Sequence, residues 1–290
     1  GACVRCGGTD RFSVNIKKQI FNCRGCSASG DVIALTQHID RCDFMTAVRT
    51  LDSGAEMAAS RNGDNRQIEP RRIDLVNQAQ IDGQNTERAL KLWADAVPIV
   101  GTIAERYLHG RGLHDLPGDD VLRFHPSCPF GKSRVACLLA LYTDIATNEP
   151  RAISRTAISA AGNKIGRMSL GPVGGAVVKI DGDENIESGL TIGEGLETCL
   201  AARQFGFRPI WSVGSAGAIK SFPVLAGIDA LTIIVDHDEG DRNGRQAGQE
   251  AALACSARWT AAGVEVRRIV PRDVGADMAD LIEHGGSHAA

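Results

Sequence analysis

The amino-acid sequence predicts a multidomain chain that combines α/β and α+β architecture. Two Cys-x2-Cys pairs stand within residues 3–26, which indicates a small N-terminal module built around the cysteines. Runs that alternate apolar and polar side chains fill much of residues 134–180, which predicts hairpins in a β-rich middle subdomain. From Gly189 onward, short apolar runs alternate with helical segments, the pattern of a mostly parallel, Rossmann-like sheet with helices on both faces.

Length and composition limit the class of protein. The 290 residues, 43% hydrophobic and 23% charged, suffice for two or three domains of roughly 100–200 residues each. No apolar stretch approaches the roughly 18 residues that cross a bilayer, and residues 1–8 lack the basic-then-apolar layout of a secretory signal. We therefore expect a cytoplasmic protein without membrane contact. The cysteines number nine, which is odd, and they are unevenly spaced along the chain. Both features argue against a disulfide scaffold.

The charge is distributed unevenly around a formal net value of −3. Residues 1–52 carry 7 Lys and Arg against 5 Asp and Glu, whereas residues 188–290 carry 9 against 13. Because the C-terminal region is acidic, its surface as a whole is not expected to attract the phosphates of nucleic acid. If nucleic acid binds, we expect it to bind locally or through metal ions.

The N-terminal cysteines have the spacing of a metal site. Two Cys-x2-Cys knuckles separated by sixteen residues can place four thiolates at the corners of a tetrahedron, which suits structural Zn²⁺. Alternation of Phe12, Val14 and Ile16 with polar residues predicts a β-hairpin between the knuckles, and hence a zinc ribbon. A rubredoxin-like iron site and unliganded thiols remain as alternatives. The expected ligands are Cys3, Cys6, Cys23 and Cys26.

Basic and aromatic residues are interleaved around this ribbon. Their composition suits phosphate contact together with base stacking on a single strand. Alternatively, Phe12 and Phe21 form the small core and the charges are simply solvated. The basic residues expected to contact template are Arg11, Lys17 and Lys18, with Arg5 and Arg24 nearby.

Two helices are predicted directly after the ribbon. Asp31 is the expected N-cap of the first, and apolar spacing continues into a second helix that ends near residue 51. A four-ligand ribbon followed by a "GDVI" helix resembles the zinc-binding domain of bacterial DNA primases. Many of those use one His ligand, whereas phage and mobile-element relatives have Cys at all four positions, as here. The resemblance leaves His38 without a role in metal binding, and we expect it on the helix surface.

The middle of the chain divides into a linker and a subdomain. Residues 53–85 are poor in large apolar side chains, which predicts a mobile linker after a first domain at 1–52. Helices near 86–99 and 102–113 then precede the β-rich runs. Residues 86–187 resemble the basic subdomain that precedes the catalytic core in bacterial primases. That resemblance implies template and nucleotide contacts for Arg155, Lys164 and Arg167, although a solvated surface role remains open for each.

The segment "FGKS" at residues 130–133 ends like a nucleotide-binding P-loop. A P-loop requires Gly five positions before Gly131, and that position is Pro126. We therefore expect no phosphate loop here and no helicase motor in the chain, so a replicative helicase would act in trans.

Polar residues gather where the C-terminal strands are predicted to end. Glu194 follows one strand, Gly214 and Ser215 follow the next, and Asp236 and Asp238 follow a third. The carboxyl ends of parallel strands meet at one edge, where chemistry collects. Clustered carboxylates suit Mg²⁺ or Mn²⁺ shared with a phosphate substrate. A merely solvated acidic loop is the alternative.

The motifs "IGEGLET" and "VDHDEGDRNGRQAG" resemble the glutamate and aspartate motifs of the Toprim domain, over residues 188–290. That domain is shared by bacterial primases, type IA and II topoisomerases and some nucleases. "GADMADLI" is similar to an acidic primase segment, which implies that Asp277 and Asp280 approach the metals. Three extra residues after the aspartate pair depart from the usual pattern, so Asp241 is either a third ligand or a bystander.

The combination of motifs favours a DNA primase. Topoisomerases need a nucleophilic Tyr in a large separate region, and the chain offers only Tyr107 and Tyr142. Toprim nucleases of the overcoming-lysogenization type carry an ATPase that is not found here. The resemblance implies RNA primer synthesis on single-stranded DNA from ribonucleoside triphosphates. A non-catalytic DNA-binding accessory of a mobile element and a Toprim nuclease remain alternatives.

Overall fold

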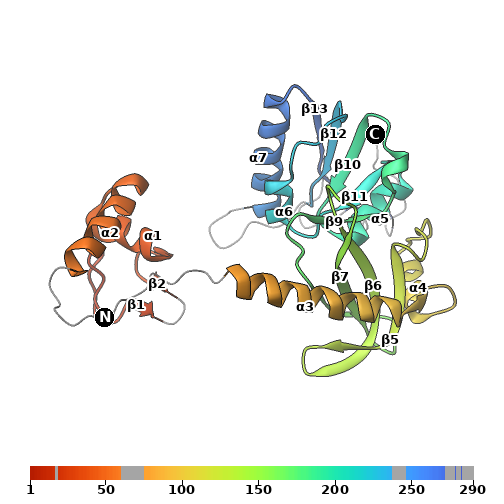
Figure 1. Cartoon of the computed structure of the whole chain (residues 1–290), viewed down its shortest axis with the longest axis horizontal. Helices are drawn as coiled ribbons and strands as arrows, with labels where there is room; N and C mark the ends of the chain where they lie inside the picture. Colours follow the sequence, from red (N-terminus) through yellow and green to blue (C-terminus); the bar gives the residue numbers. More distant parts are fainter. Residues whose placement is uncertain (17–18, 60–74, 237–245, 272–277, 279–281, 283–290) are drawn as a thin grey trace. The chain divides into compact units, whose positions relative to one another are not determined.

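The computed structural model describes residues 1–16, 19–59, 75–236, 246–271, 278 and 282 (Figure 1). The chain divides into two compact units, Gly1–Arg72 and Ile73–Ala290. The boundary falls inside the segment 53–85 that the sequence predicts as a linker. Among the described residues, no helix has both the length and the apolarity that a bilayer span requires.

The N-terminal unit joins a small antiparallel sheet to two helices. Strand β1 (Phe12–Asn15) pairs with β2 (Ile20–Cys23), and β2 pairs with the short β3 (Ser29–Gly30). The pairing of Phe12 with Cys23 places the second knuckle beside the start of β1. The predicted hairpin between the knuckles is therefore confirmed.

Side-chain caps begin both helices of this unit. In α1 (Val32–Asp40), Oδ1 of Asp31 accepts a hydrogen bond from Ala34 N at 2.9 Å, which confirms the predicted N-cap. In α2 (Phe44–Ala59), Oδ1 of Asp43 accepts from Thr46 N at 2.8 Å. These bonds satisfy backbone donors that a helix start leaves without an intrahelical partner.

Helix occupies both ends of the predicted linker. Helix α2 continues to Ala59, and α3 (Leu75–Ala94) starts ten residues before 85. The shortage of large apolar residues does not exclude helix, because Ala, Gln, Glu and Arg favour it intrinsically. Residues 60–74 lie outside the described part.

Within its described residues, the C-terminal unit is built on one ten-stranded sheet. The hydrogen-bonded order is β13-β12-β10-β11-β9-β6-β5-β4, with β7 paired to β6 and β8 to β7. The strands are β4 (Val97–Pro98), β5 (Leu122–Phe130), β6 (Ser133–Asp144), β7 (Pro150–Ile158), β8 (Lys164–Leu170), β9 (Ala176–Lys179), β10 (Gly189–Gly193), β11 (Ile210–Ser212), β12 (Ala230–Ile234) and β13 (Glu265–Ile269).

The middle strands form the antiparallel hairpins that the sequence predicts, plus one that it does not. Strand β5 contains Pro126 and Pro129, and a register shift between His125 and Cys128 accommodates the first proline. The "FGKS" segment is the tight connection between β5 and β6, in which Phe130 pairs with Ser133. It therefore forms a hairpin turn, as the missing P-loop glycine implied.

The strands β10 to β13 are parallel to one another and bear helices on both faces (Figure 1). On one face, α6 (Ala216–Ser221) and α7 (Ala247–Ala261) pack on alternate strand residues such as Ile192 and Ile233. On the other, α5 (Leu196–Gln204) and α4 (Ile103–Gly110) share a core with Ile210 and Ile234. The predicted fold class is therefore confirmed. A single-turn 3-10 helix, Asp183–Asn185, precedes β10.

Candidate functional site

The four N-terminal cysteines converge on one point. Their sulfur atoms all lie within 4.8 Å of one another. The two knuckles interleave, because Sγ of Cys3 lies 4.0 Å from Sγ of Cys26, and Sγ of Cys6 lies 3.5 Å from that of Cys23. Four sulfur donors at such spacings fit tetrahedral Zn²⁺. All four positions of that tetrahedron are occupied by protein, which makes the site structural.

The electrostatics of these thiols point to a cation. A hydrogen bond with the neighbouring Cys23 thiol is the main cause that raises the pKa of Cys6 to about 12, and repulsion between the two thiolates adds to it. Backbone N–H donors, that of Cys26 first, lower the pKa of Cys23 to about 6. A hydrogen bond with His38 is the main cause that lowers the pKa of Cys3 to about 7. A divalent ion removes the conflict, because all four sulfurs can then be ionised together.

His38 is not on the helix surface, so that expectation was wrong. Its side chain lies in the last turn of α1 and is only 7% exposed. The ring stacks on Phe12 and lies tilted against Phe21, and its Nε2 lies 3.3 Å from Sγ of Cys3. The ribbon core buries it because α1 packs directly on β2 and β3.

The basic residues of the ribbon are described only in part. Arg11 is exposed, and the outer part of its side chain lies beside Gly8, which follows the first knuckle, and Gly25, which is within the second. Arg24 donates to the backbone carbonyl of Asp10 at 2.7 Å. The predicted template residues Lys17 and Lys18 lie outside the described residues.

In the C-terminal unit, Glu194 and Asp236 leave neighbouring parallel strands at the same edge. The register pairs Gly193 with Ile234, so Glu194 comes one residue after the end of β10 and Asp236 two residues after the end of β12. Each is partly buried. The Oγ1 hydroxyl of Thr198, in the first turn of α5, donates to Oδ1 of Asp236 at 3.2 Å and fixes that carboxylate. Asp238, Asp241, Asp277 and Asp280 lie outside the described residues, so their predicted roles stay predictions.

Gly214 and Ser215 adjoin this acidic edge, as the sequence predicts. Gly214 N donates to the Glu194 carbonyl at 2.9 Å, and the Ser212 hydroxyl donates to the same oxygen at 3.1 Å. Gly214 has a φ of +89°, a conformation that favours glycine. Ser215 caps α6, since its Oγ accepts from Ala218 N at 3.1 Å.

Two of the three predicted basic residues reach the acidic edge. Arg167, exposed on β8, donates to the Gly214 carbonyl at 3.1 Å. Lys164, at the start of β8, places Nζ 2.8 Å from Oε1 of Glu197. The β8 hairpin thereby contacts the edge at which β10 and β11 end.

Arg155 requires a correction, because it does not face solvent. Its side chain is 7% exposed on β7, and its guanidinium donates to the carbonyls of Pro129 and Ser169 at 2.6 and 3.0 Å. Helix α3 covers this strand on the side of Ala157. The geometry therefore favours a structural role, in which the arginine joins β7 to the backbone of β5 and of β8.

Models of known families match three stretches of the chain. Residues 7–67 match the CHC2 zinc finger, residues 189–288 match the Toprim domain, and residues 83–180 match a domain of unknown function. The zinc-finger match begins after the first knuckle. The chain therefore carries a CHC2 zinc finger and a Toprim domain, and it is similar to bacterial DNA primases.

Curated primases align with part of this chain. The DNA primases of Escherichia coli K12 and Shigella flexneri are each 31% identical over 121 residues, which is 41% of the chain. That alignment spans 20% of the length of each primase.

Solved primase structures were also matched. The zinc-binding and RNA polymerase domains of Aquifex aeolicus primase cover 96% of the chain and 73% of that structure, at 15% identity and a TM-score of 0.46. A Pseudomonas aeruginosa primase domain matches 69% of the chain and 75% of that structure, at 14% identity and a TM-score of 0.46.

One residue beside the acidic edge was missed by sequence reasoning. Glu197 is 5% exposed, and its Oε1 accepts hydrogen bonds from Tyr107 at 2.9 Å and Lys164 at 2.8 Å. Burial opposes its ionisation, but Lys164 outweighs burial and lowers the pKa of Glu197. The signal in the sequence was its place in "IGEGLET", three residues after Glu194.

Pockets open among the described residues of this unit. One of 500 Å³ is bounded by Arg106, Arg111 and Lys164, which makes it suited to phosphate. Another, of 400 Å³, is bounded by Tyr142, Val213 and Gly214 beside the acidic edge.

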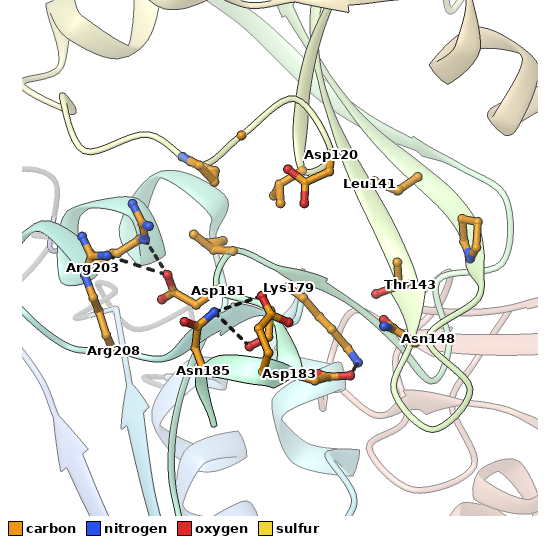
Figure 2. A pocket seen from close by; sticks show the side chains of 17 residues that line it. Asp120, Leu141, Thr143, Asn148, Lys179, Asp181, Asp183, Asn185, Arg203 and Arg208 are labelled. Carbon is orange, nitrogen blue, oxygen red and sulfur yellow. Dashed lines mark hydrogen bonds and ion pairs between the residues drawn. The ribbon is translucent and has the colours of Figure 1, made fainter. Parts of the chain in front are cut away.

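A third pocket, of 490 Å³, lies near the start of β11 rather than its end (Figure 2). There Asp181 accepts from Ile210 N at 3.0 Å and pairs with Nε of Arg203 at 2.8 Å. Lys179 pairs with Asp183 at 2.7 Å. The charged side chains named here are paired with one another. We therefore interpret this group of ion pairs as structural and not as a binding site.

Proposed function

We propose that the chain is a DNA-directed RNA polymerase of the primase type, which synthesises short RNA primers on single-stranded DNA. The observation that carries the proposal is the departure of Glu194 and Asp236 from adjacent parallel strands at one edge. In open α/β sheets this edge is where ligands bind. The similarity to bacterial DNA primases supports this class of reaction.

The acidic residues would hold divalent cations. Carboxylate oxygens are the preferred ligands of Mg²⁺ and Mn²⁺, and the proposed set is Glu194, Asp236 and Asp238, with Asp277 approaching. Cations bound there would lower the pKa of the primer 3′-hydroxyl and offset the charge on the departing pyrophosphate. Thr198 supports this role, because its hydroxyl holds Oδ1 of Asp236 in a fixed orientation.

The basic residues beside the edge would hold phosphate groups. Arg167 and the pocket of Arg106, Arg111 and Lys164 offer cationic donors on the elements that flank Glu197. Guanidinium groups bind phosphate through paired hydrogen bonds, which suits a triphosphate or a template backbone. Arg155 has no part in this proposal.

The N-terminal unit would contribute to template binding. Exposed Arg11 and the predicted contacts of Lys17 and Lys18 would neutralise phosphates on single-stranded DNA. A replicative helicase acting in trans would supply that strand in the cytoplasm.

Template-dependent nucleotide incorporation tests the proposal. The zinc-loaded full chain is incubated with single-stranded DNA, Mg²⁺ or Mn²⁺ and labelled ribonucleotides, and the products are resolved by length. We expect short oligoribonucleotides whose formation requires template, and their loss in both Asp236→Asn and Asp238→Asn. Synthesis retained in both variants would refute the proposed residues.

The same incubation distinguishes the other readings. DNA binding without any product would indicate a non-catalytic accessory, and shortening of the labelled template would indicate a nuclease. Deoxyribonucleotides supplied in a parallel reaction would establish which sugar the site prefers.

A further inference from the structure

A buried histidine faces both knuckles of the zinc site. Nε2 of His38 lies 3.3 Å from Sγ of Cys3, in the first knuckle, and 3.9 Å from Sγ of Cys26, in the second. The sequence separates it from the nearer sulfur by 35 residues. Its position therefore depends on the docking of α1 against the ribbon.

Aromatic packing fixes the orientation of this ring. The His38 ring stacks on Phe12 with an interplanar angle of 8° and a centroid distance of 6.4 Å. Phe21, itself buried, contacts the ring at 5.5 Å. Because these residues begin β1 and lie within β2, the hairpin that carries the second knuckle also holds the imidazole in place.

The chemistry of the cluster makes the imidazole a donor. Four thiolates around Zn²⁺ leave a net charge of about −2, and an N–H directed at a sulfur disperses part of it. A neutral imidazole carries one N–H, and the tautomer protonated at Nε2 directs it at Cys3. The four sulfurs already complete a tetrahedral set, so the ring is not needed as a ligand.

We propose that His38 is a positioning residue of the zinc site, which donates its Nε2–H to the Cys3 thiolate and slows the release of zinc. Because His38 lies on α1, its hydrogen bond to Cys3 forms only when this helix is folded against the ribbon. Retention of zinc therefore depends on the folding of α1. Outer partners of metal ligands commonly change metal affinity about 10–100-fold. The inference concerns the N-terminal unit and does not depend on the proposed polymerase activity.

Zinc release from the full chain tests this role. Zinc-loaded wild type, His38→Phe, His38→Gln and the control Gln37→Ala are mixed with excess chromogenic chelator, and the release rate is recorded. His38→Phe keeps an aromatic ring against Phe12 and Phe21 but removes the N–H, so we expect release about tenfold faster or more. Gln offers an amide N–H near the same position and should restore slow release in part. Gln37→Ala, a change on the same helix, should behave as wild type.

Cobalt substitution separates a donor from a ligand. The Co²⁺ absorption spectrum should indicate four sulfur ligands in both wild type and His38→Phe. A wild-type spectrum with three sulfurs and one nitrogen would overturn the proposal, because the imidazole would then bind the metal itself.

The release rates provide the other decisive outcomes. Wild-type release by His38→Phe would overturn the proposal. If His38→Phe retains no zinc, His38→Gln is compared with a further variant, His38→Ala, whose side chain has no N–H. Slower release from His38→Gln than from His38→Ala supports the hydrogen bond, and equal release refutes it. Far-UV circular dichroism of each variant verifies that the helices remain folded.

Discussion

Nζ of Lys164 lies 2.8 Å from Oε1 of Glu197, and this ion pair joins the β8 hairpin to α5, the helix that follows β10. The two side chains are unequal, since that of Lys164 is 37% exposed and that of Glu197 is 6% exposed. The Tyr107 hydroxyl shares the same carboxylate oxygen. The buried Glu197 carboxylate therefore depends on the more exposed Lys164 for its compensating positive charge.

Removal of Lys164 should destabilise the C-terminal unit. Lys164→Met leaves the Glu197 carboxylate buried beside Tyr107 without its cation, at a cost of about 1–3 kcal/mol after allowance for the exposed lysine. Urea unfolding at neutral pH measures the loss. The double variant Lys164→Met with Glu197→Gln should recover part of it, because no buried charge remains. A single variant as stable as wild type would contradict the coupling.

Asp144 should make stability sensitive to acid. Backbone N–H groups of Thr147 and Ala146, followed by Arg151, lower its pKa from 3.8 to about 2. A lowered folded-state pKa stabilises the fold above the unfolded value, and the contribution disappears as pH falls from about 4 to 2. Wild type should therefore be more stable than Asp144→Asn at pH 5, and the difference should shrink toward pH 2.5. Denaturant titrations across this range check it, and a constant difference would count against the assignment.

Gly214 should tolerate no side chain. An added methyl group would overlap the Tyr142 hydroxyl, in a backbone conformation that already disfavours alanine. Gly206 provides a matched control, since its φ is +91° but open space surrounds it. Gly206→Ala should cost about 1 kcal/mol, whereas Gly214→Ala should cost more and also reduce primer synthesis. Thermal unfolding and the incorporation assay compare them, and equal behaviour of the two variants would reject the steric argument.

Arg167 should matter for activity more than for stability. It is exposed and donates to the Gly214 carbonyl at the acidic edge. Arg167→Ala should weaken nucleotide or template use by tenfold or more, about 1.4 kcal/mol, with an unfolding midpoint near that of wild type. Arg134→Ala, which removes an exposed arginine bonded to Ser127 at 3.2 Å, is the control. Equal activity of the two variants would remove Arg167 from the phosphate-binding set.

Local signals in the sequence predicted much of this structure. Three features could be predicted without knowledge of tertiary contacts, because each depends only on residues nearby in the chain. They are the cysteine spacing, the Asp31 cap and the alternation of strands with helices. Glu194 and Asp236 could be paired in advance because parallel strands end at a common edge.

The missed features depend on long-range contacts. His38 resembles a helix-surface residue until α1 docks on the ribbon, and Arg155 resembles a surface cation until carbonyls from two other segments surround it. Glu197 occupies an ordinary first-turn position, and its burial follows from Tyr107, 90 residues away. Strand β5 was not predicted because it contains two prolines, which are uncommon within strands. The register shift that accommodates one of them arises only when β5 pairs with β6.

Manganese binding tests the central claim most directly, namely that Glu194 and Asp236 hold divalent cations together. The zinc-loaded full chain is titrated with Mn²⁺ while electron paramagnetic resonance reports the free ion, for wild type, Glu194→Gln, Asp236→Asn and the control Glu265→Gln. Glu265 begins β13, at the opposite end of the parallel strands. We predict that each edge variant weakens Mn²⁺ binding at least tenfold, about 1.4 kcal/mol, and that the control binds as wild type does. Wild-type affinity in both edge variants would contradict the account.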